Sequence, residues 1–187
     1  MTMPSCTQIL VSLRNADPTA LTARECLQHS LGFGTRLASL RRSVLWEMHG
    51  PADEDPAPVL DRIRRTGEIW NPNKEAALVR LPGQPASALG GALMGGSGYE
   101  IFLAWDPERD LARRVRILLP SGGSGWRLAR GTVWALLWQD EDASARRRLS
   151  EQAVLCRGPR EGLLVHPHLE DFRRITQDEP VPWLPAA

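Results

Sequence analysis

Hydrophobic and polar positions in the first part of the chain predict a strand followed by a helix. Residues 8–13 form a mostly apolar run of β-favouring side chains, which predicts a strand. A helix is expected next, because Asp17 can cap its first turn and Pro18 needs no N–H there. Gly32 and Gly34 end this helix. Its apolar face consists of Ala20, Ala23, Leu27 and Leu31.

The pattern then continues as strand, helix and strand up to residue 81. Residues 36–48 contain apolar side chains throughout and predict either one bent strand or a hairpin. A polar, proline-containing turn leads to a short helix with apolar residues at positions 59–63. After Asn71-Pro72, residues 76–81 predict a returning strand.

The second part of the chain repeats this order. Residues 99–105 predict a strand, and Asp106 and Pro107 again provide a cap and a first helical turn. The helix that follows carries an apolar stripe of Leu111, Val115, Leu118 and Leu119. Three elements complete the repeat, namely a strand over residues 132–138, a helix with Leu149, Ala153 and Cys156, and a last strand over residues 169–175.

Landmarks in the two parts are separated by a nearly constant distance along the chain. The separation is 89 residues at the Asp-Pro steps, 91 at the Arg-Leu-Ala steps and 95 at the later prolines. These landmarks begin at Asp17 and Asp106, Arg36 and Arg127, and Pro72 and Pro167. We interpret the pattern as an internal duplication. An accidental likeness of two common helix starts is the alternative.

The predicted elements define two units and a connection. Residues 84–98 are uncharged and rich in Gly, Ala and Ser, which is typical of a linker. We expect a first unit over residues 1–83, this linker, a second unit over residues 99–178 and a proline-rich tail over residues 179–187. Each unit is expected to follow the β-α-β-β-α-β order of a ferredoxin-like fold, which is of the α+β class. Two such units are expected to pack as a pseudo-dimer.

Short motifs occur at the element boundaries of both units. The first unit contains Val11-Ser12-Leu13, Asp17-Pro18, Leu31-Gly32-Phe33 and Ile69-Trp70-Asn71-Pro72-Asn73-Lys74-Glu75. The second contains Asp106-Pro107 and the run Leu163-Leu164-Val165-His166-Pro167-His168-Leu169-Glu170-Asp171-Phe172. Together they resemble the PurS family, the small subunit of the bacterial formylglycinamidine ribonucleotide amidotransferase (phosphoribosylformylglycinamidine synthase) of purine biosynthesis. The resemblance covers residues 7–81 and 99–175.

The chain also departs from the family pattern. Thr19-Ala20 and Glu108-Arg109 follow the Asp-Pro steps, where the family usually has a small residue or glycine. His166 stands where asparagine is usual, and Gly158-Pro159 interrupts the second helix of the second unit. A typical member is a single unit that pairs with another copy. This chain would carry the pair in one polypeptide.

The resemblance implies an adaptor without a catalytic residue of its own. PurS proteins bridge a glutaminase that releases ammonia and an ATP-using synthetase that consumes it, so these two subunits are the implied partners. Self-association of the fused pair is left open. The family-motif positions are expected to fix backbone turns or to contact partners, and they are Asp17, Pro18, Asn71, Pro72, Asp106, Pro107, His166 and Pro167.

Composition narrows the class of partner. The 23 Lys+Arg and 22 Asp+Glu residues give a formal charge of +1, which lacks the basic excess of a nucleic-acid or anionic membrane surface. No uninterrupted apolar stretch approaches the ~20 residues that span a bilayer. Three widely spaced cysteines without a CxxC motif and a start without a secretory signal predict a reducing, cytoplasmic location. Protein partners are therefore expected, with neither nucleic acid nor membrane.

The residues predict no catalytic set, cofactor or metal. The glycine-rich stretches match no phosphate-binding motif. His166-Pro167-His168 is the one metal-like feature, with Cys156 as a further candidate ligand, but the paired ligands of a structural zinc site are missing.

Two other classes of function stay open. One is a small-molecule-binding regulatory module with its site at the seam between the paired units. The other is an enzyme with a cleft between them, which no motif favours. Among the seven tryptophans, Trp70 and Trp183 are expected to be exposed. Those on predicted strands are expected in the core or in an interface between the units, and they are Trp46, Trp105, Trp134 and Trp138.

Overall fold

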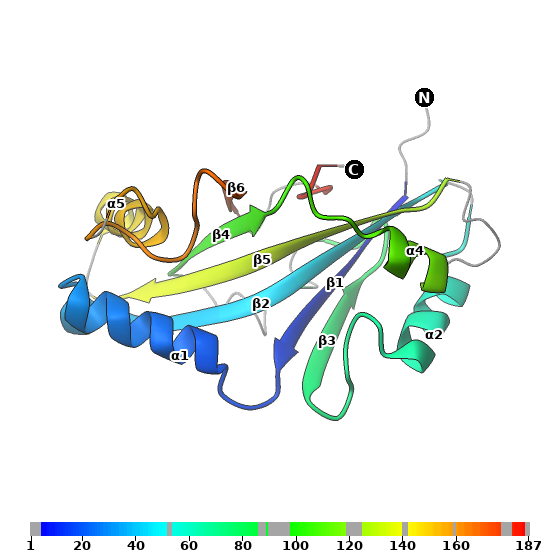
Figure 1. The fold of residues 1–187 in the computed structure, drawn as a ribbon, viewed down its shortest axis with the longest axis horizontal. Coiled ribbons are helices and arrows are strands. Elements are labelled where there is room, and N and C mark those ends of the chain that lie inside the picture. Colours follow the sequence, from blue (N-terminus) through cyan, green and yellow to red (C-terminus); the bar gives the residue numbers. More distant parts are fainter. Residues whose placement is uncertain are drawn as a thin grey trace.

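The chain folds as an α+β protein, seen here in a computed structural model. The structure describes residues 5–51, 54–85, 89, 98–118, 125–139, 142–158, 160–176 and 181–185. Within these residues, six strands form one antiparallel sheet and four α-helices pack against it (Figure 1). The α+β class predicted from the sequence is confirmed. None of the helices in this part of the chain is long and apolar enough to cross a membrane.

The strands follow the order β3-β1-β2-β5-β4-β6 across the sheet, and all neighbours are antiparallel. Their bounds are β1 Ser5–Leu13, β2 Leu37–Gly50, β3 Glu75–Arg80, β4 Tyr99–Trp105, β5 Arg127–Trp138 and β6 Asp171–Ile175. β2 is one continuous strand of 14 residues, so the predicted strand at residues 36–48 is not a hairpin and begins at Leu37. In the described residues β1–β3 and β4–β6 are thus sets of three strands, one strand fewer than the β-α-β-β-α-β order contains. We call β1 to β3 with their helices the first half, and β4 to β6 with theirs the second half.

Helices connect the strands within each half. Their bounds are α1 Pro18–Glu25, α2 Ala57–Thr66, α4 Ala112–Leu118 and α5 Ala143–Val154. α1 continues into the π-helical turn η1 (Cys26–Ser30), and the 3-10 turn η2 (Gly34–Arg36) leads into β2. Asp17 begins α1 as predicted, because its carboxylate accepts hydrogen bonds from the N–H groups of Thr19 and Ala20 at 2.8 and 3.3 Å.

The predicted start of the second-half helix at Asp106-Pro107 is wrong. The Asp106 carboxylate accepts a hydrogen bond from the Glu108 N–H and closes a turn directly after β4. α4 begins later, at Ala112, whose N–H bonds to the carboxylate of Asp110. The chain first crosses from the end of β4 to the neighbourhood of α2, and only there does the helix form (Figure 1).

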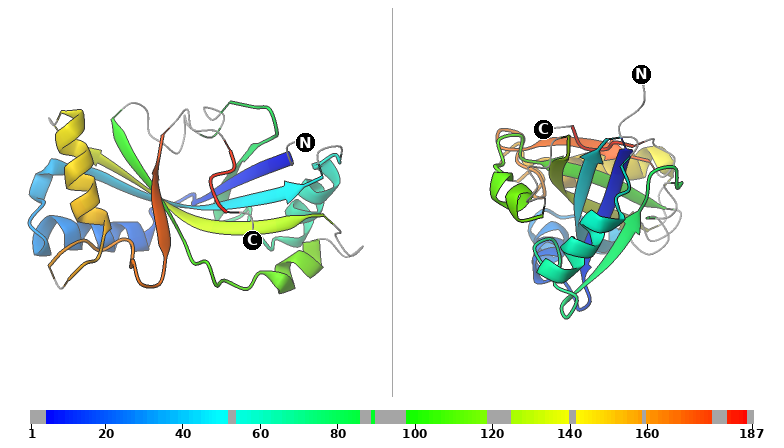
Figure 2. Two further views of the ribbon diagram at one scale, coloured as in Figure 1. Left: turned by 90° about the horizontal axis from the view of Figure 1, so that it is seen from above. Right: turned by 90° about the vertical axis from the view of Figure 1, so that its right-hand side faces the viewer.

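The four helices cover one face of the sheet as two pairs at opposite ends (Figures 1 and 2). α1 and α5 share one hydrophobic core with β2, β4 and β5. α2 and α4 share another with β1, β2 and β5. Each pair therefore combines one helix from each half, and the side chains of both halves interdigitate in each core.

The two halves use the same strand pairing. Their matched cross-strand pairs are Ile9–Trp46 and Phe102–Trp134, and likewise Val11–Ala77 and Ala104–Phe172. In the middle of the sheet, Arg42 pairs with Trp134 and Trp46 pairs with Arg130. Residues 42–46 and 130–134 therefore occupy matching places. The Arg-Leu-Ala landmarks at residues 36 and 127 do not, so that alignment of the two halves was wrong by a few residues.

The other face of the sheet is covered by segments outside the two halves. Val181, Trp183 and Leu184 pack there against Leu45 and Leu103, together with the fully buried Leu89. Of the predicted linker, residues 86–88 and 90–97 lie outside the described residues. The expected exposure of two tryptophans is wrong, since Trp70 and Trp183 keep only 9% and 2% of their surface exposed. Trp46, Trp134 and Trp138 are buried as expected.

Candidate functional site

Two proline turns, one in each half, have the same geometry. At the first, the Glu75 carboxylate accepts a hydrogen bond from the Asn71 N–H at 2.6 Å. At the second, the Glu170 carboxylate accepts one from the His166 N–H at 3.2 Å. In each turn the glutamate N–H bonds back to the carbonyl of the residue before the proline, at 2.8 and 2.9 Å. The motif residues that hold these turns are Asn71, Pro72, His166 and Pro167.

In the first half, the Asp-Pro step lies beside its proline turn. The Arg14 side chain donates a hydrogen bond to the Pro72 carbonyl at 3.2 Å. Asp17 caps α1 and also pairs with Arg42 at 3.3 Å, while Pro18 is the first helical residue. A surface pocket of about 300 Å³ opens here, lined by Asp17 and by leucines 13 and 21. We call this group of residues the first motif cluster.

In the second half, Asp106, Pro107 and Pro167 line one pocket of about 550 Å³. His168 and the strongly exposed Leu169 line it as well. We call this group the second motif cluster. The proline turns of the two clusters directly precede β3 and β6, so these turns lie at opposite edges of the sheet, whereas the first pocket lies beside the end of β1 and residues 40–43 of β2.

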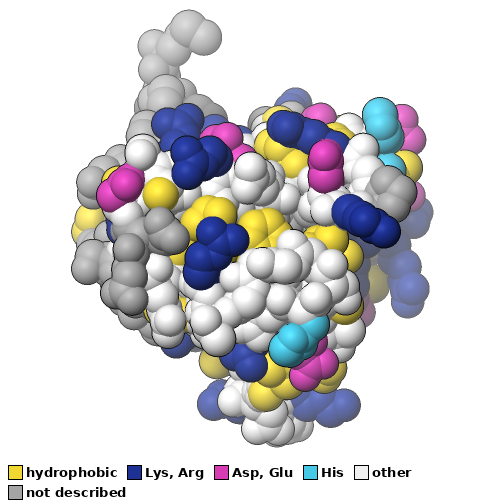
Figure 3. Space-filling view, turned by 90° about the vertical axis from the view of Figure 1, so that its left-hand side faces the viewer, with side chains coloured by type: hydrophobic (Ala, Val, Ile, Leu, Met, Phe, Trp, Pro, Cys, Tyr) yellow, Lys and Arg dark blue, Asp and Glu magenta, His cyan; other side chains and the backbone are white. Residues whose placement is uncertain are grey.

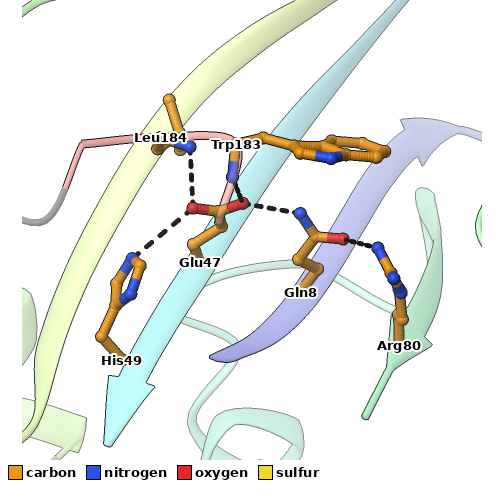
Figure 4. A network of polar contacts seen from close by, with 6 residues as sticks. All are labelled: Gln8, Glu47, His49, Arg80, Trp183 and Leu184. Atoms are coloured by element: carbon orange, nitrogen blue, oxygen red, sulfur yellow. Dashed lines mark hydrogen bonds and ion pairs between the residues drawn. The ribbon is translucent and has the colours of Figure 1, made fainter. Parts of the chain in front are cut away.

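A buried carboxylate lies on the sheet face that the tail covers (Figure 4). Glu47 is fully buried, and its Oε1 accepts hydrogen bonds from the side-chain amide of Gln8 at 2.6 Å and from the Trp183 N–H at 2.7 Å. Its Oε2 accepts one from the Leu184 N–H at 2.9 Å and lies 3.5 Å from Nε2 of His49. The carboxylate thus joins the centre of the sheet to the C-terminal segment.

A cation supports this carboxylate through Gln8. Arg80 donates to the side-chain carbonyl of Gln8 at 3.2 Å and to the backbone carbonyl of Gln84 at 2.8 Å. Arg80, Gln8 and Glu47 are direct neighbours across β3, β1 and β2. Removing a carboxylate from water costs several kcal/mol unless hydrogen bonds and charge replace its hydration. Here Gln8, which is held by Arg80, and two backbone N–H groups of the tail supply those partners together.

Cys6 and His49 lie next to this carboxylate, and their polar atoms and those of Glu47 lie within 4.8 Å of one another. In the described part of the chain this is the one His, Cys, Asp and Glu group close enough to hold a metal ion. While the tail is in place, Oε1 of Glu47 accepts two hydrogen bonds and Oε2 accepts one from the Leu184 N–H. In this structure the carboxylate therefore holds the C-terminal segment.

The thiol of Cys6 is not set up as a nucleophile. Burial, with a smaller contribution from the negative charge of Glu47, raises its pKa to about 12, so the thiol stays protonated at neutral pH. Sequence reasoning missed this group because position 6 is far from positions 47 and 49 along the chain. The pairing of Cys6 with His49 across β1 and β2 joins them. The only sequence signal is that Glu47 and His49 alternate onto one face of a strand.

Another pocket, which we call the seam pocket, lies between the two halves at the end formed by α1 and α5. It has a volume of about 380 Å³, and its apolar floor includes Leu31 and Phe33 from the first half and Leu155 from the second. Figure 3 faces this end and shows hydrophobic side chains in a hollow with basic side chains around it. Three arginines and two glutamates, Glu151 and Glu161, line the pocket as well. Within the described residues the three arginines form no ion pair, and they are Arg36, Arg157 and Arg160.

Similarity to known proteins adds no family to this picture. No protein-family model matches the chain, and comparisons with curated proteins and with solved structures give no significant match. The resemblance to PurS therefore rests on the sequence motifs of this chain alone.

Proposed function

We propose that the chain is a tandem PurS-like adaptor, a covalent pseudo-dimer of two ferredoxin-like units that bridges a glutaminase and a synthetase. The observation that carries the proposal is the shared turn at Asn71-Pro72 and His166-Pro167, with the same glutamate hydrogen bond in both halves. The matched strand pairing of the two halves supports it further. β2 and β5, the matching strands of the two halves, pair at the centre of the sheet, as the strands of two identical subunits would in a dimer.

The placement of the motif clusters suits an adaptor with two partners. Each cluster has a surface pocket and exposed leucines, with Leu13 and Leu21 at the first and Leu169 at the second. Exposed apolar side chains beside polar ones are the usual core of a protein interface. Because the proline turns of the clusters lie at opposite edges of the sheet, two different proteins can dock without overlapping.

Co-purification from the native host tests the adaptor role. The full chain, tagged, is expected to bring down both a glutaminase and an ATP-using synthetase. Leu21→Asp and Leu169→Asp are each expected to remove one of the two partners, because a buried charge at an interface is costly. Leu81→Asp, at an exposed leucine that lines neither cluster, is the matched control. Recovery of neither enzyme with the unaltered chain would overturn the proposal.

The seam pocket favours a second candidate, a regulatory module that binds a small molecule. Its apolar residues and its excess of three arginines over two glutamates suit an anion with an apolar body, such as an aryl phosphate. A ligand that binds only the folded state raises the melting temperature. Phenyl phosphate is expected to raise it more than inorganic phosphate does, and Arg157→Ala to abolish the difference. Arg113→Ala, on α4 at the other end, is the control, and no shift with phenyl phosphate would exclude this candidate.

A further inference from the structure

We propose that the groove holding residues 181–185 is a peptide-binding site, and that this segment is its own displaceable occupant. We call residues 181–185 the strap. The proposal goes beyond the adaptor function and does not depend on it. The ligand is an extended segment that presents two successive backbone N–H groups and two apolar side chains, as the strap does at Trp183 and Leu184.

The recognition contacts are directed at the backbone. One oxygen of Glu47 accepts the Trp183 N–H at 2.7 Å, and the other accepts the Leu184 N–H at 2.9 Å (Figure 4). Two successive N–H groups on the two oxygens of one carboxylate fix both the position and the direction of the bound chain. Charge-assisted hydrogen bonds of this kind are stronger than neutral ones.

Small residues make room for the bound segment. Glu47 pairs across the strands with Ala129, and Leu45 pairs with Gly131. A Cβ on Gly131 would lie 3.0 Å from the side chain of Leu184 and 2.7 Å from that of Leu103. A side chain at position 131 would crowd Leu184, so glycine leaves room there for the apolar side chain of the bound segment.

The second half of the chain provides an internal comparison. We call Arg80, Gln8 and Glu47, which are neighbours across β3, β1 and β2, the polar row. At the matching places of β6, β4 and β5 lie Ile175, Ile101 and Ala135, the apolar row. The apolar row satisfies no backbone donor. A cover held by hydrophobic contact alone needs no carboxylate, so the polar row in the first half is explained by recognition of N–H groups.

The polar row also determines which segments the groove can bind. Without a bound segment Glu47 keeps its bond to Gln8 and its contact with His49, but it loses both backbone donors. Water entering the emptied groove can hydrate the carboxylate, but it cannot replace the apolar contacts that Trp183 and Leu184 make. The groove therefore favours any segment that returns two N–H groups and these apolar contacts, and a partner segment of the strap's chemistry competes with the strap itself.

A nicked form of the full chain tests the proposal. A specific protease site is introduced within residues 177–180, the folded protein is cut there, and a fluorescent peptide of residues 181–187 is added. We expect the labelled peptide to replace the strap and to bind the groove, measured by fluorescence anisotropy. A peptide N-methylated at the two amides that contact Glu47 is expected to bind at least tenfold more weakly. Both peptides are measured on the same nicked protein, so a difference in folding between protein variants cannot produce the result.

Glu47→Gln in the nicked chain is the matched protein variant, since it keeps the side-chain shape and removes the charge. We expect it to weaken the unmethylated peptide at least tenfold and to change the binding of the methylated peptide little. Failure of the labelled peptide to exchange would overturn the proposal and leave the strap as a permanent part of the core. Loss of the far-UV circular dichroism signal on displacement would overturn it too, as would equal binding of the methylated peptide.

Discussion

The two ends of the sheet are built alike but closed differently. At the α1 and α5 end, Phe33 precedes β2 and its ring packs against Trp138, the last residue of β5, at a centroid distance of 5.5 Å. At the α2 and α4 end, Trp126 precedes β5 and lies over Gly50, the last residue of β2. At both ends, an aromatic residue before one central strand lies against the last residue of the other central strand. That last residue is Trp138 at the α1 and α5 end and Gly50 at the α2 and α4 end.

The two ends also differ in the space that remains between their helices. At the α2 and α4 end the space beside Trp126 is only about 10 Å³, so we call it the closed end. At the other, open end a pocket of about 380 Å³ remains beside Phe33. A large ring placed on glycine fills the space between two helices, whereas two rings in contact leave the outer part free. A fold of two matching halves can therefore keep one interhelical pocket and fill the other with a single side chain.

The largest expected effect is at the closed end. Trp126→Ala removes a buried ring from the core shared by α2 and α4, and it should lower the free energy of unfolding by about 3–5 kcal/mol. Phe33→Leu at the open end keeps most of the apolar volume and should cost only the ring contact, about 0.5–1.5 kcal/mol. Urea unfolding of both variants measures the difference. Equal losses would mean that the two ends are not packed differently.

Alkaline pH should also act on the closed end, through Cys6. Its pKa is raised from 9.0 to about 12 in the folded protein, mainly by burial. The neutral thiol stabilises the fold fully below pH 9, and this contribution is lost as the pH rises from 9 towards 12, by at most about 4 kcal/mol. The pH dependence of urea unfolding should therefore be flatter above pH 9 in Cys6→Ala. Cys26→Ala, at the half-buried cysteine in η1, is the control and should keep the steeper dependence.

Gly50→Ala tests the close approach of Trp126 directly. A Cβ at this position would lie 2.6 Å from the Trp126 ring, so the ring must move and the variant should lose about 1–3 kcal/mol of stability. Gly158→Ala is the control near the open end, where a Cβ would meet no atom within 4 Å. Thermal unfolding of the two variants decides the point, and an unchanged melting temperature in Gly50→Ala would contradict the packing described.

The smallest effects concern the two indole N–H groups. At the open end, Trp138 donates to the buried Ser150 hydroxyl at 2.6 Å, so Ser150→Ala leaves a buried donor unpaired and should cost about 1–2 kcal/mol. At the closed end, Trp126 donates to the exposed Glu54 at 2.8 Å, and water can replace that partner. Glu54→Gln should therefore change the free energy of unfolding by less than about 0.5 kcal/mol. A larger loss in Glu54→Gln than in Ser150→Ala would reverse the comparison.

Much of the local structure could be predicted because it depends on near neighbours along the chain. Short apolar runs of β-favouring residues predict strands at residues 8–13 and 99–105, where β1 and β4 lie. Asp17 caps α1 because its carboxylate reaches N–H groups two and three residues away. The same short-range pattern gave a wrong prediction at Asp106, whose carboxylate closes a turn instead of capping a helix. A pattern of near neighbours does not contain the position of α2, against which α4 packs.

The seam between the halves was one expected place for a ligand, but the residues of the seam pocket and of the tail groove could not be predicted in the same way. Cys6, Glu47 and His49 come together only through the register of β1 on β2, and the tail reaches Glu47 from more than 130 residues away along the chain. The exposure expected for Trp183 was wrong for the same reason, since burial follows from the groove beneath it. The seam pocket likewise requires residues of both halves.

The sequence by itself determined the α+β class, the order of most elements and the repeated proline turns. Hydrogen bonds and apolar periodicity within a few residues are sufficient for these features. Only the tertiary structure decided that helices from both halves share each core, that one end stays open, and that the tail occupies a groove with a carboxylate at its centre. These depend on strand register and on close packing between distant segments, where a single residue such as Gly50 or Glu47 changes what fits.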